Sequence, residues 1–105
     1  MRLLKSLLSA LLLTMACSGQ AQLSERQSRL LVVNCIQCHA RGNAGFPIMG
    51  NPDDWKTRNR QGEDRLLRSV IEGLGGMPPL GYCAACSEAD LRALTRLVAG
   101  LEGGK

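Results

Sequence analysis

Apolar residues recur at helical spacing near both ends of the chain, and each of these stretches has a recognisable start. In the first, Ser24 followed three positions later by Gln27 is a capping box, so we expect a helix that continues toward Cys35. In the last, Ser87 caps a helix with a regular apolar stripe. That stripe consists of Leu91, Leu94, Leu97, Val98 and Leu101. We expect the two helices to cross, with Leu30, Leu31 and Val33 packed against Leu94, Leu97 and Val98.

Two shorter helices are predicted between them. Asn51 is a good N-cap and Pro52 suits the first turn, so a helix should begin here and run to about Gln61. Apolar residues repeat at helical spacing again over 66–71, and Gly73 should end that helix. No segment alternates convincingly enough for a strand. The pattern therefore predicts an all-α domain of about four short helices.

Two long loops separate these helices and are rich in glycine and proline. They span about residues 41–50 and 73–81. Ordered loops of this length are uncommon in so small a domain unless they pack against something. The pattern thus points to an object held between them.

The N-terminal segment has the features of a secretory signal peptide. A positive head with Arg2 and Lys5 precedes an uncharged apolar run over 7–16, and small residues follow at Gly19 and Ala21. We expect residues 1–21 to be removed and residues 22–105 to form one domain. The run is too short to span a membrane. Cys17 offers an alternative, because a cysteine after an apolar run also resembles a lipoprotein site, which would tether the protein to a membrane.

Composition narrows the class of protein. Of the 105 residues, 45% are hydrophobic but only 3% are aromatic, so a core built from side chains alone would be thin. The formal charge of +4 includes Arg2 and Lys5, and their removal leaves a net positive charge that is too small to indicate nucleic-acid binding. Export would place the cysteines in an oxidising compartment.

The strongest chemical signal is Cys35-Ile36-Gln37-Cys38-His39, the attachment motif of c-type haem. On one helical turn the two thiols can bond the two vinyl groups of a haem, and His39 then presents its imidazole to the iron. His39 is also the single histidine of the chain. We therefore expect one covalent haem c, which would also supply the missing core volume.

Three other interpretations of the cysteines remain open at this point. Cys35, Cys38, Cys83 and Cys86 have the form of two zinc knuckles, although their separation exceeds that of common zinc ribbons. A thioredoxin-like redox motif would require a βαβ context. Two structural disulfides would leave His39 and the long loops unexplained.

A haem iron with one histidine ligand takes a sixth ligand or stays open to small molecules. Met77 stands in Gly-Gly-Met-Pro-Pro, where glycine permits close backbone approach and proline stiffens the segment. We expect Met77 to be that ligand and Met49 to be the competitor. A six-coordinate iron leaves no room for substrate, which favours an electron carrier over an enzyme.

These motifs together resemble the class I c-type cytochromes, most closely the small bacterial cytochrome c5 group. The resemblance covers about residues 33–97 and includes CIQCH, WKTR, GLGGMPPLG and CAACS. It implies that Cys83 and Cys86 form a short disulfide and that the Pro47 carbonyl accepts the N–H of His39. It also implies that Trp55 and Arg58 meet the haem propionates, with Arg60 as the competitor for that charge.

Two positions depart from the group's usual pattern. Asn51 stands in place of an acid, and Leu80 replaces the lysine that follows the Met-Pro-Pro segment. The second change removes a positive charge beside the expected haem edge. Leu80, with Phe46 or Tyr82, would instead form an apolar rim there.

The resemblance implies periplasmic electron transfer between a donor and an acceptor that are both redox proteins. A haem subunit dedicated to one dehydrogenase or oxidase is the alternative, and a peroxidase-like or gas-sensing haem is a third class. Contact with a membrane is expected only through lipidation of Cys17 or docking to membrane complexes.

Overall fold

The computed structural model describes residues 22–101, and within them the expected all-α class is confirmed. The expected leader, including Cys17, lies outside this range. The elements are α1 (Glu25–Leu30), the π-helix η1 (Leu31–Cys35), α2 (Ile36–His39), α3 (Pro52–Asn59), α4 (Glu63–Glu72), the 3-10 helix η2 (Pro79–Tyr82) and α5 (Glu88–Ala99). In this part of the chain the sole β-type pairing is an isolated bridge between Leu74 and Met77.

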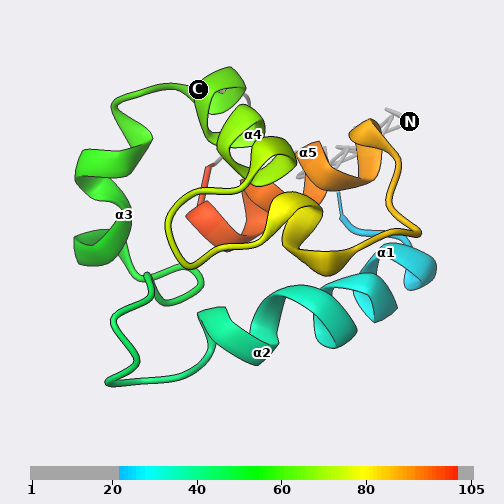
Figure 1. Cartoon of the computed structure of the whole chain (residues 1–105), viewed down its shortest axis with the longest axis horizontal. Coiled ribbons are helices and arrows are strands. Elements are labelled where there is room, and N and C mark those ends of the chain that lie inside the picture. The colour runs from blue at the N-terminus through cyan, green and yellow to red at the C-terminus, as the bar shows by residue number, and fades with distance from the viewer. Residues whose placement is uncertain (1–21, 102–105) are drawn as a thin grey trace, which may run out of the picture.

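The first three elements form one continuous helical rod along one side of the domain (Figure 1). The capping box at Ser24 begins it, as expected. The π-turn was not expected. In it the Ile36 amide donates to the Leu31 carbonyl, and the Asn34 side chain donates to the Leu30 carbonyl at 3.0 Å. Such turns often occur at functional sites, and this one directly precedes the turn that carries Cys38 and His39.

The loop over residues 40–51 connects this rod to α3, and the loop over 73–87 crosses between α4 and the rod (Figure 1). Glycines with positive φ bound α4 at both ends, Gly62 and Gly73. The helix is thus one turn longer than the apolar repeat alone indicated. The 3-10 helix η2 was not predicted, because prolines and glycines there suggested only a loop.

The core forms where the first and last helices meet, as expected. The main buried cluster contains Leu31, Trp55, Leu66, Leu94, Val98 and Ala99. A second cluster contains Leu67, Cys83 and Leu91. Two predicted core residues are wrong, because Val33 is 67% exposed and Leu97 is 45% exposed. Leu97 stands one position before buried Val98 and Val33 two positions after buried Leu31, where the side chains turn outward.

Candidate functional site

A cavity of about 490 Å³ opens between the helices and the two long loops. Seven of the expected site residues line it: Cys35, Cys38, His39, Pro47, Trp55, Arg58 and Met77. Most of the other lining residues are apolar, among them Leu66, Val70, Leu94 and Val98. The volume lies within the range of pockets that enclose small molecules and cofactors.

The ring of His39 is fixed in orientation by the following loop. Its Nδ1 lies 2.7 Å from the carbonyl oxygen of Pro47. Because a carbonyl can only accept, Nδ1 must carry the proton and donate it. The other ring nitrogen, Nε2, then keeps its lone pair for a metal, as is usual for histidine ligands.

Side chains from α3 hold this loop in place. The indole N–H of Trp55 donates to the Ile48 carbonyl at 2.8 Å, and the Asp54 carboxylate accepts from the Ile48 amide at 2.9 Å. The Met49 amide donates to the His39 carbonyl at 2.7 Å. Asp54 was missed as a site residue, because an acid in a first helical turn is already explained by the helix dipole.

Trp55 lines the cavity while its N–H is donated to the Ile48 carbonyl. Its ring centroid lies 5.9 Å from that of His39, and the residue is 8% exposed. Arg58 lines the cavity and Arg60 does not. The Arg58 guanidinium donates to the backbone carbonyl of Asp54 at 2.6 Å, which holds it beside the residue whose carboxylate binds the Ile48 amide.

The two cysteines of the first motif are free thiols on the cavity wall. Cys35 is half-buried and Cys38 is exposed. Burial raises the pKa of the Cys35 thiol. Two free thiols, one oriented imidazole and a largely apolar cavity fit the chemistry of a covalently attached haem, because both attachment points and the histidine ligand come from one short segment that lines the cavity.

Met77 reaches the cavity from a tight turn over residues 74–77. The Leu74 amide donates to the Met77 carbonyl at 3.0 Å, and the Met77 amide donates back at 2.9 Å. A Cβ on Gly73 would lie 3.0 Å from the Met77 carbonyl oxygen, so the close approach requires glycine. Met49, in contrast, does not line the cavity.

The zinc and thioredoxin interpretations are wrong. Within residues 22–101 no group of three or more His, Cys, Asp or Glu side chains could hold a metal ion. Cys83 and Cys86 are joined as a disulfide with Cα atoms 5.4 Å apart, which leaves the described part of the chain with two free cysteines. A βαβ unit is likewise absent from the described elements.

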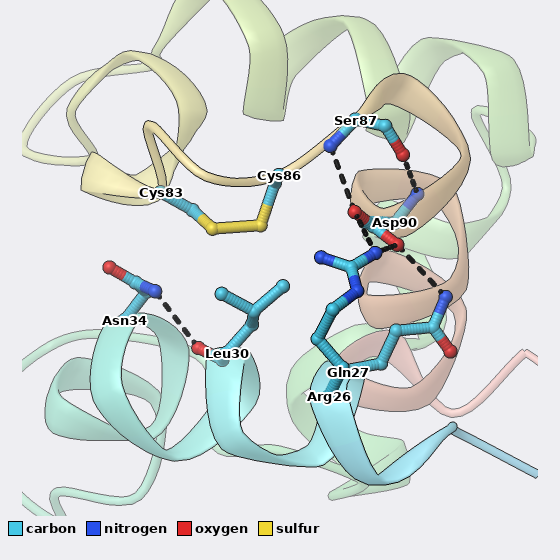
Figure 2. Close-up of a disulfide and its surroundings, with 8 residues drawn as sticks. All are labelled: Arg26, Gln27, Leu30, Asn34, Cys83, Cys86, Ser87 and Asp90. Carbon is cyan, nitrogen blue, oxygen red and sulfur yellow. Dashed lines mark hydrogen bonds and ion pairs between the residues drawn. A yellow bond between two sulfur atoms is a disulfide. The ribbon is translucent and has the colours of Figure 1, made fainter.

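Neither cysteine of the disulfide lines the cavity, and the bridge lies just before Ser87, the N-cap of α5 (Figure 2). Cys83 is 1% exposed and packs with Leu67 and Leu91, while Leu30 packs against the same cluster. Backbone hydrogen bonds over residues 78–86 are all local to that segment. The bridge and the burial of Cys83 thus attach the loop to the core.

Comparisons with known proteins agree with this site. The family model described as cytochrome c oxidase, cbb3-type, subunit III matches residues 21–98. Cytochrome c5 of Ectopseudomonas mendocina is 36% identical over 74 residues, which cover 69% of this chain and 85% of that protein.

Two solved structures share the fold. One is the cytochrome c in a crystal structure of an electron transfer complex with nitrite reductase, with a TM-score of 0.66 and 38% identity over 75% of this chain and 96% of that one. The other is a mono-haem ferrocytochrome c from Shewanella putrefaciens, with a TM-score of 0.62 and 36% identity over 74% and 95%. With its Cys-x-x-Cys-His cavity, the chain belongs to the class I cytochromes c, is similar to the cytochromes c5, and carries one covalent haem c as an electron carrier rather than an enzyme.

Proposed function

We propose that this protein is an exported carrier of one electron whose haem iron is held between His39 and Met77. The observation that carries the proposal is that both side chains line one cavity while Met49 does not. A thioether ligand favours the reduced state of iron and raises its potential. With both His39 and Met77 bound to it, the iron would have no open site for a substrate.

Each part of the chain has a defined role in this mechanism. When bound, the haem supplies a one-electron couple between ferric and ferrous iron. Cys35 and Cys38 would hold it through thioether bonds, and His39 would offer Nε2 because Pro47 fixes its Nδ1–H. Apolar residues such as Leu66 and Leu94 exclude water.

The propionates would meet the α3 side of the cavity. Among residues 22–101, Arg58 is the one lining residue with a fixed charge. A guanidinium there would pair with a carboxylate in surroundings that are otherwise apolar. Trp55 would contribute packing next to His39 rather than a hydrogen bond, because its N–H is donated to Ile48.

Export to the periplasm is part of the proposal. The leader-like residues 1–21 support it, as does a disulfide, which persists in oxidising compartments. Within residues 22–101, no helix has both the length and the apolar character required to cross a membrane. The mass of the exported protein tests this: cleavage after Ala21 gives a chain that begins at Gln22, whereas lipidation leaves an acylated Cys17 at the N-terminus.

We propose that donor and acceptor are redox proteins, as nitrite reductase is for the structural neighbour. A second candidate is a haem subunit dedicated to one oxidase. The family model that matches is described as an oxidase subunit, which favours it. Gel filtration of the native extract separates the two, because a carrier elutes alone and a dedicated subunit elutes with its complex.

Absorption spectra of the purified holoprotein test the carrier assignment. We expect sharp c-type bands on reduction, a weak near-infrared band in the ferric state from thioether ligation, and no response to carbon monoxide. Rapid binding of carbon monoxide would show an open iron and favour the gas-sensing or peroxidase-like class.

A further inference from the structure

One peptide group connects the carboxylate of Asp54 to the ring of His39. The carbonyl oxygen of the peptide between Pro47 and Ile48 lies 2.7 Å from Nδ1 of His39 and accepts its proton in a hydrogen bond. The N–H of the same peptide donates to Oδ2 of Asp54 at 2.9 Å. A planar trans peptide directs its C=O and N–H to opposite sides, so both hydrogen bonds form at once. We call the Asp54 carboxylate, this peptide and the His39 ring the relay.

The Asp54 carboxylate brings a full negative charge to the relay. Its residue is half-buried, and none of the ion pairs among residues 22–101 includes it. Arg58 lies one turn further along α3, but its guanidinium donates to the backbone carbonyl of Asp54 rather than to the carboxylate. The hydrogen bond from Ile48 is therefore to a charged acceptor, and such bonds are roughly twice as strong as neutral ones.

A charged acceptor at one end of a hydrogen-bonded chain strengthens the next bond in the chain. The carboxylate polarises the peptide through the Ile48 N–H, which makes the Pro47 oxygen more negative. That oxygen is then a stronger acceptor for the Nδ1–H of His39. A metal-binding histidine becomes a more basic ligand when its other nitrogen donates to a strong acceptor. The relay would thus increase the electron density at Nε2 of His39.

We propose that Asp54 is a positioning residue that acts on His39 through the 47–48 peptide and lowers the reduction potential of the haem iron. The inference rests on the proposed function, because it requires His39 as a ligand of the iron. A more basic imidazole stabilises ferric iron, whereas the Met77 thioether favours ferrous iron. Asp54 would thereby limit the rise in potential that Met77 causes.

A purely structural role of Asp54 has different consequences. An acid in the first turn stabilises its helix, and the bond to Ile48 also tethers the loop. Loss of these contributions would lower the stability of the fold without altering the electron density of the His39 ring. Asp53 is the matched control, because it precedes Asp54 in the same turn, is exposed and forms no ion pair among residues 22–101.

The first measurement is the reduction potential of the holoprotein in a redox titration. Asp54→Asn keeps a side-chain oxygen that can accept from the Ile48 amide, but it removes the charge. At a fixed solution potential the ratio of oxidised to reduced protein should fall at least about threefold, a rise of about 28 mV at about 59 mV per tenfold change. Asp53→Asn removes the same charge from an exposed position where salt screens it, and the ratio should change less than about 1.5-fold. Equal changes in the two variants would overturn the proposal.

NMR spectroscopy distinguishes polarisation through the relay from the loss of a nearby charge. His39 is the single histidine of the chain, so isotope labelling of histidine nitrogen reports on this ring alone. In ferrous Asp54→Asn the resonances of Nδ1 and its proton should shift upfield, because a weaker hydrogen bond leaves both more shielded. Asp54→Ala removes the acceptor altogether and should shift them at least as far, while Asp53→Asn should leave them unchanged. Resonances that move in neither Asp54 variant would refute the relay, even with altered potentials.

The outcomes separate this inference from the function it rests on. If the wild type has thioether-type spectra and is inert to carbon monoxide, but Asp54→Asn behaves like Asp53→Asn, the carrier assignment stands and the relay is refuted. If His39 of the holoprotein shows the resonances of an unligated imidazole, the proposed function itself fails and the inference fails with it. An unchanged near-infrared band in each variant confirms that a change in potential does not come from loss of Met77.

Discussion

The guanidinium of Arg26, in the first turn of α1, lies 2.6 Å from both carboxylate oxygens of Asp90, in the first turn of α5. Figure 2 shows that Asp90 also accepts from the Ser87 amide and from the Gln27 side chain. One buried carboxylate thus caps the last helix and binds it to the first. These contacts hold the pKa of Asp90 well below its usual range, with the Arg26 hydrogen bond as the largest cause.

Asp90→Asn should therefore lower stability in a pH-dependent manner. A carboxyl with a depressed pKa stabilises the fold above its unfolded pKa of about 3.9 and loses that contribution as the pH falls below it. In urea unfolding, the gap between the midpoints of wild type and variant should be widest near neutral pH and should narrow progressively as the pH falls from about 4 toward the lower folded-state pKa of Asp90. Asp53→Asn is the control, since Asp53 is an exposed first-turn acid with no ion pair among residues 22–101. A gap that stays constant with pH would contradict the assignment.

Met77→Ala should keep the covalent haem but lose the near-infrared band and lower the reduction potential. The reduction potential should fall by an amount on the order of 0.1 V, within the range of about 0.8 V over which haem ligands set the potential. Met49→Ala is the matched variant, because Met49 lies in the other loop and does not line the cavity. Survival of the band in Met77→Ala together with its loss in Met49→Ala would show that the ligand is Met49.

Gly73→Ala should destabilise the protein more than the same substitution at Gly62, because a side chain at Gly73 would also collide with the Met77 turn. Gly73 has φ 85° and ψ 153°, and a Cβ there would meet the Met77 carbonyl oxygen at 3.0 Å. Gly62 has nearly the same conformation, φ 88° and ψ 159°, with open space around it. Gly62→Ala should cost about 1–3 kcal/mol of stability from backbone strain. Gly73→Ala should cost more and also weaken the near-infrared band, and equal effects in both variants would argue against a close approach.

Trp55→Phe should loosen the loop that orients His39. It removes one of the two donors to the Ile48 carbonyl, which keeps its hydrogen bond from the Asn51 amide at 3.0 Å. We therefore expect a cost of about 0.5–1.5 kcal/mol in unfolding free energy for the lost bond, plus the cost of the smaller ring volume. Hydrogen exchange of the Met49 amide should accelerate, because that amide bonds the His39 carbonyl in the same loop. Tyr82→Phe serves as the control, since the Tyr82 side chain is largely in solvent. Unchanged protection at Met49 would show that Trp55 acts by packing alone.

The double variant Cys83→Ser, Cys86→Ser should incorporate haem and keep nearly the same potential. It should unfold at lower denaturant, because a bridge that closes so short a loop contributes roughly 2 kcal/mol. Met77 should also detach more readily on heating, because the disulfide attaches its loop to the core. Reduction of the wild type with a dithiol should reproduce these effects. Mass spectrometry that finds two free thiols at Cys83 and Cys86 in the native protein would contradict the bridge.

Local sequence was sufficient for the four expected helices and for the cysteine and histidine motif of the site, but it predicted neither the π-helix η1 nor the 3-10 helix η2. The capping box at Ser24 and the N-cap at Ser87 were both predicted, and Gly73 ends its helix as expected. Cys35, Cys38 and His39 lie within five consecutive residues, so their spacing alone indicates the chemistry of haem attachment. These features depend on neighbours a few positions apart, which a sequence displays directly.

Only the tertiary structure determined which residues of distant segments contact one another and which remain exposed. The outward positions of Val33 and Leu97 depend on which face of each helix meets the other. The use of the Trp55 N–H by Ile48 and the ion pair between Arg26 and Asp90 join residues that spacing does not relate. The contact between the two long loops is of the same kind, because Gly76 of one loop approaches Phe46 of the other. Periodicity states which residues are apolar, but only the packing of the whole chain determines which of them reach solvent.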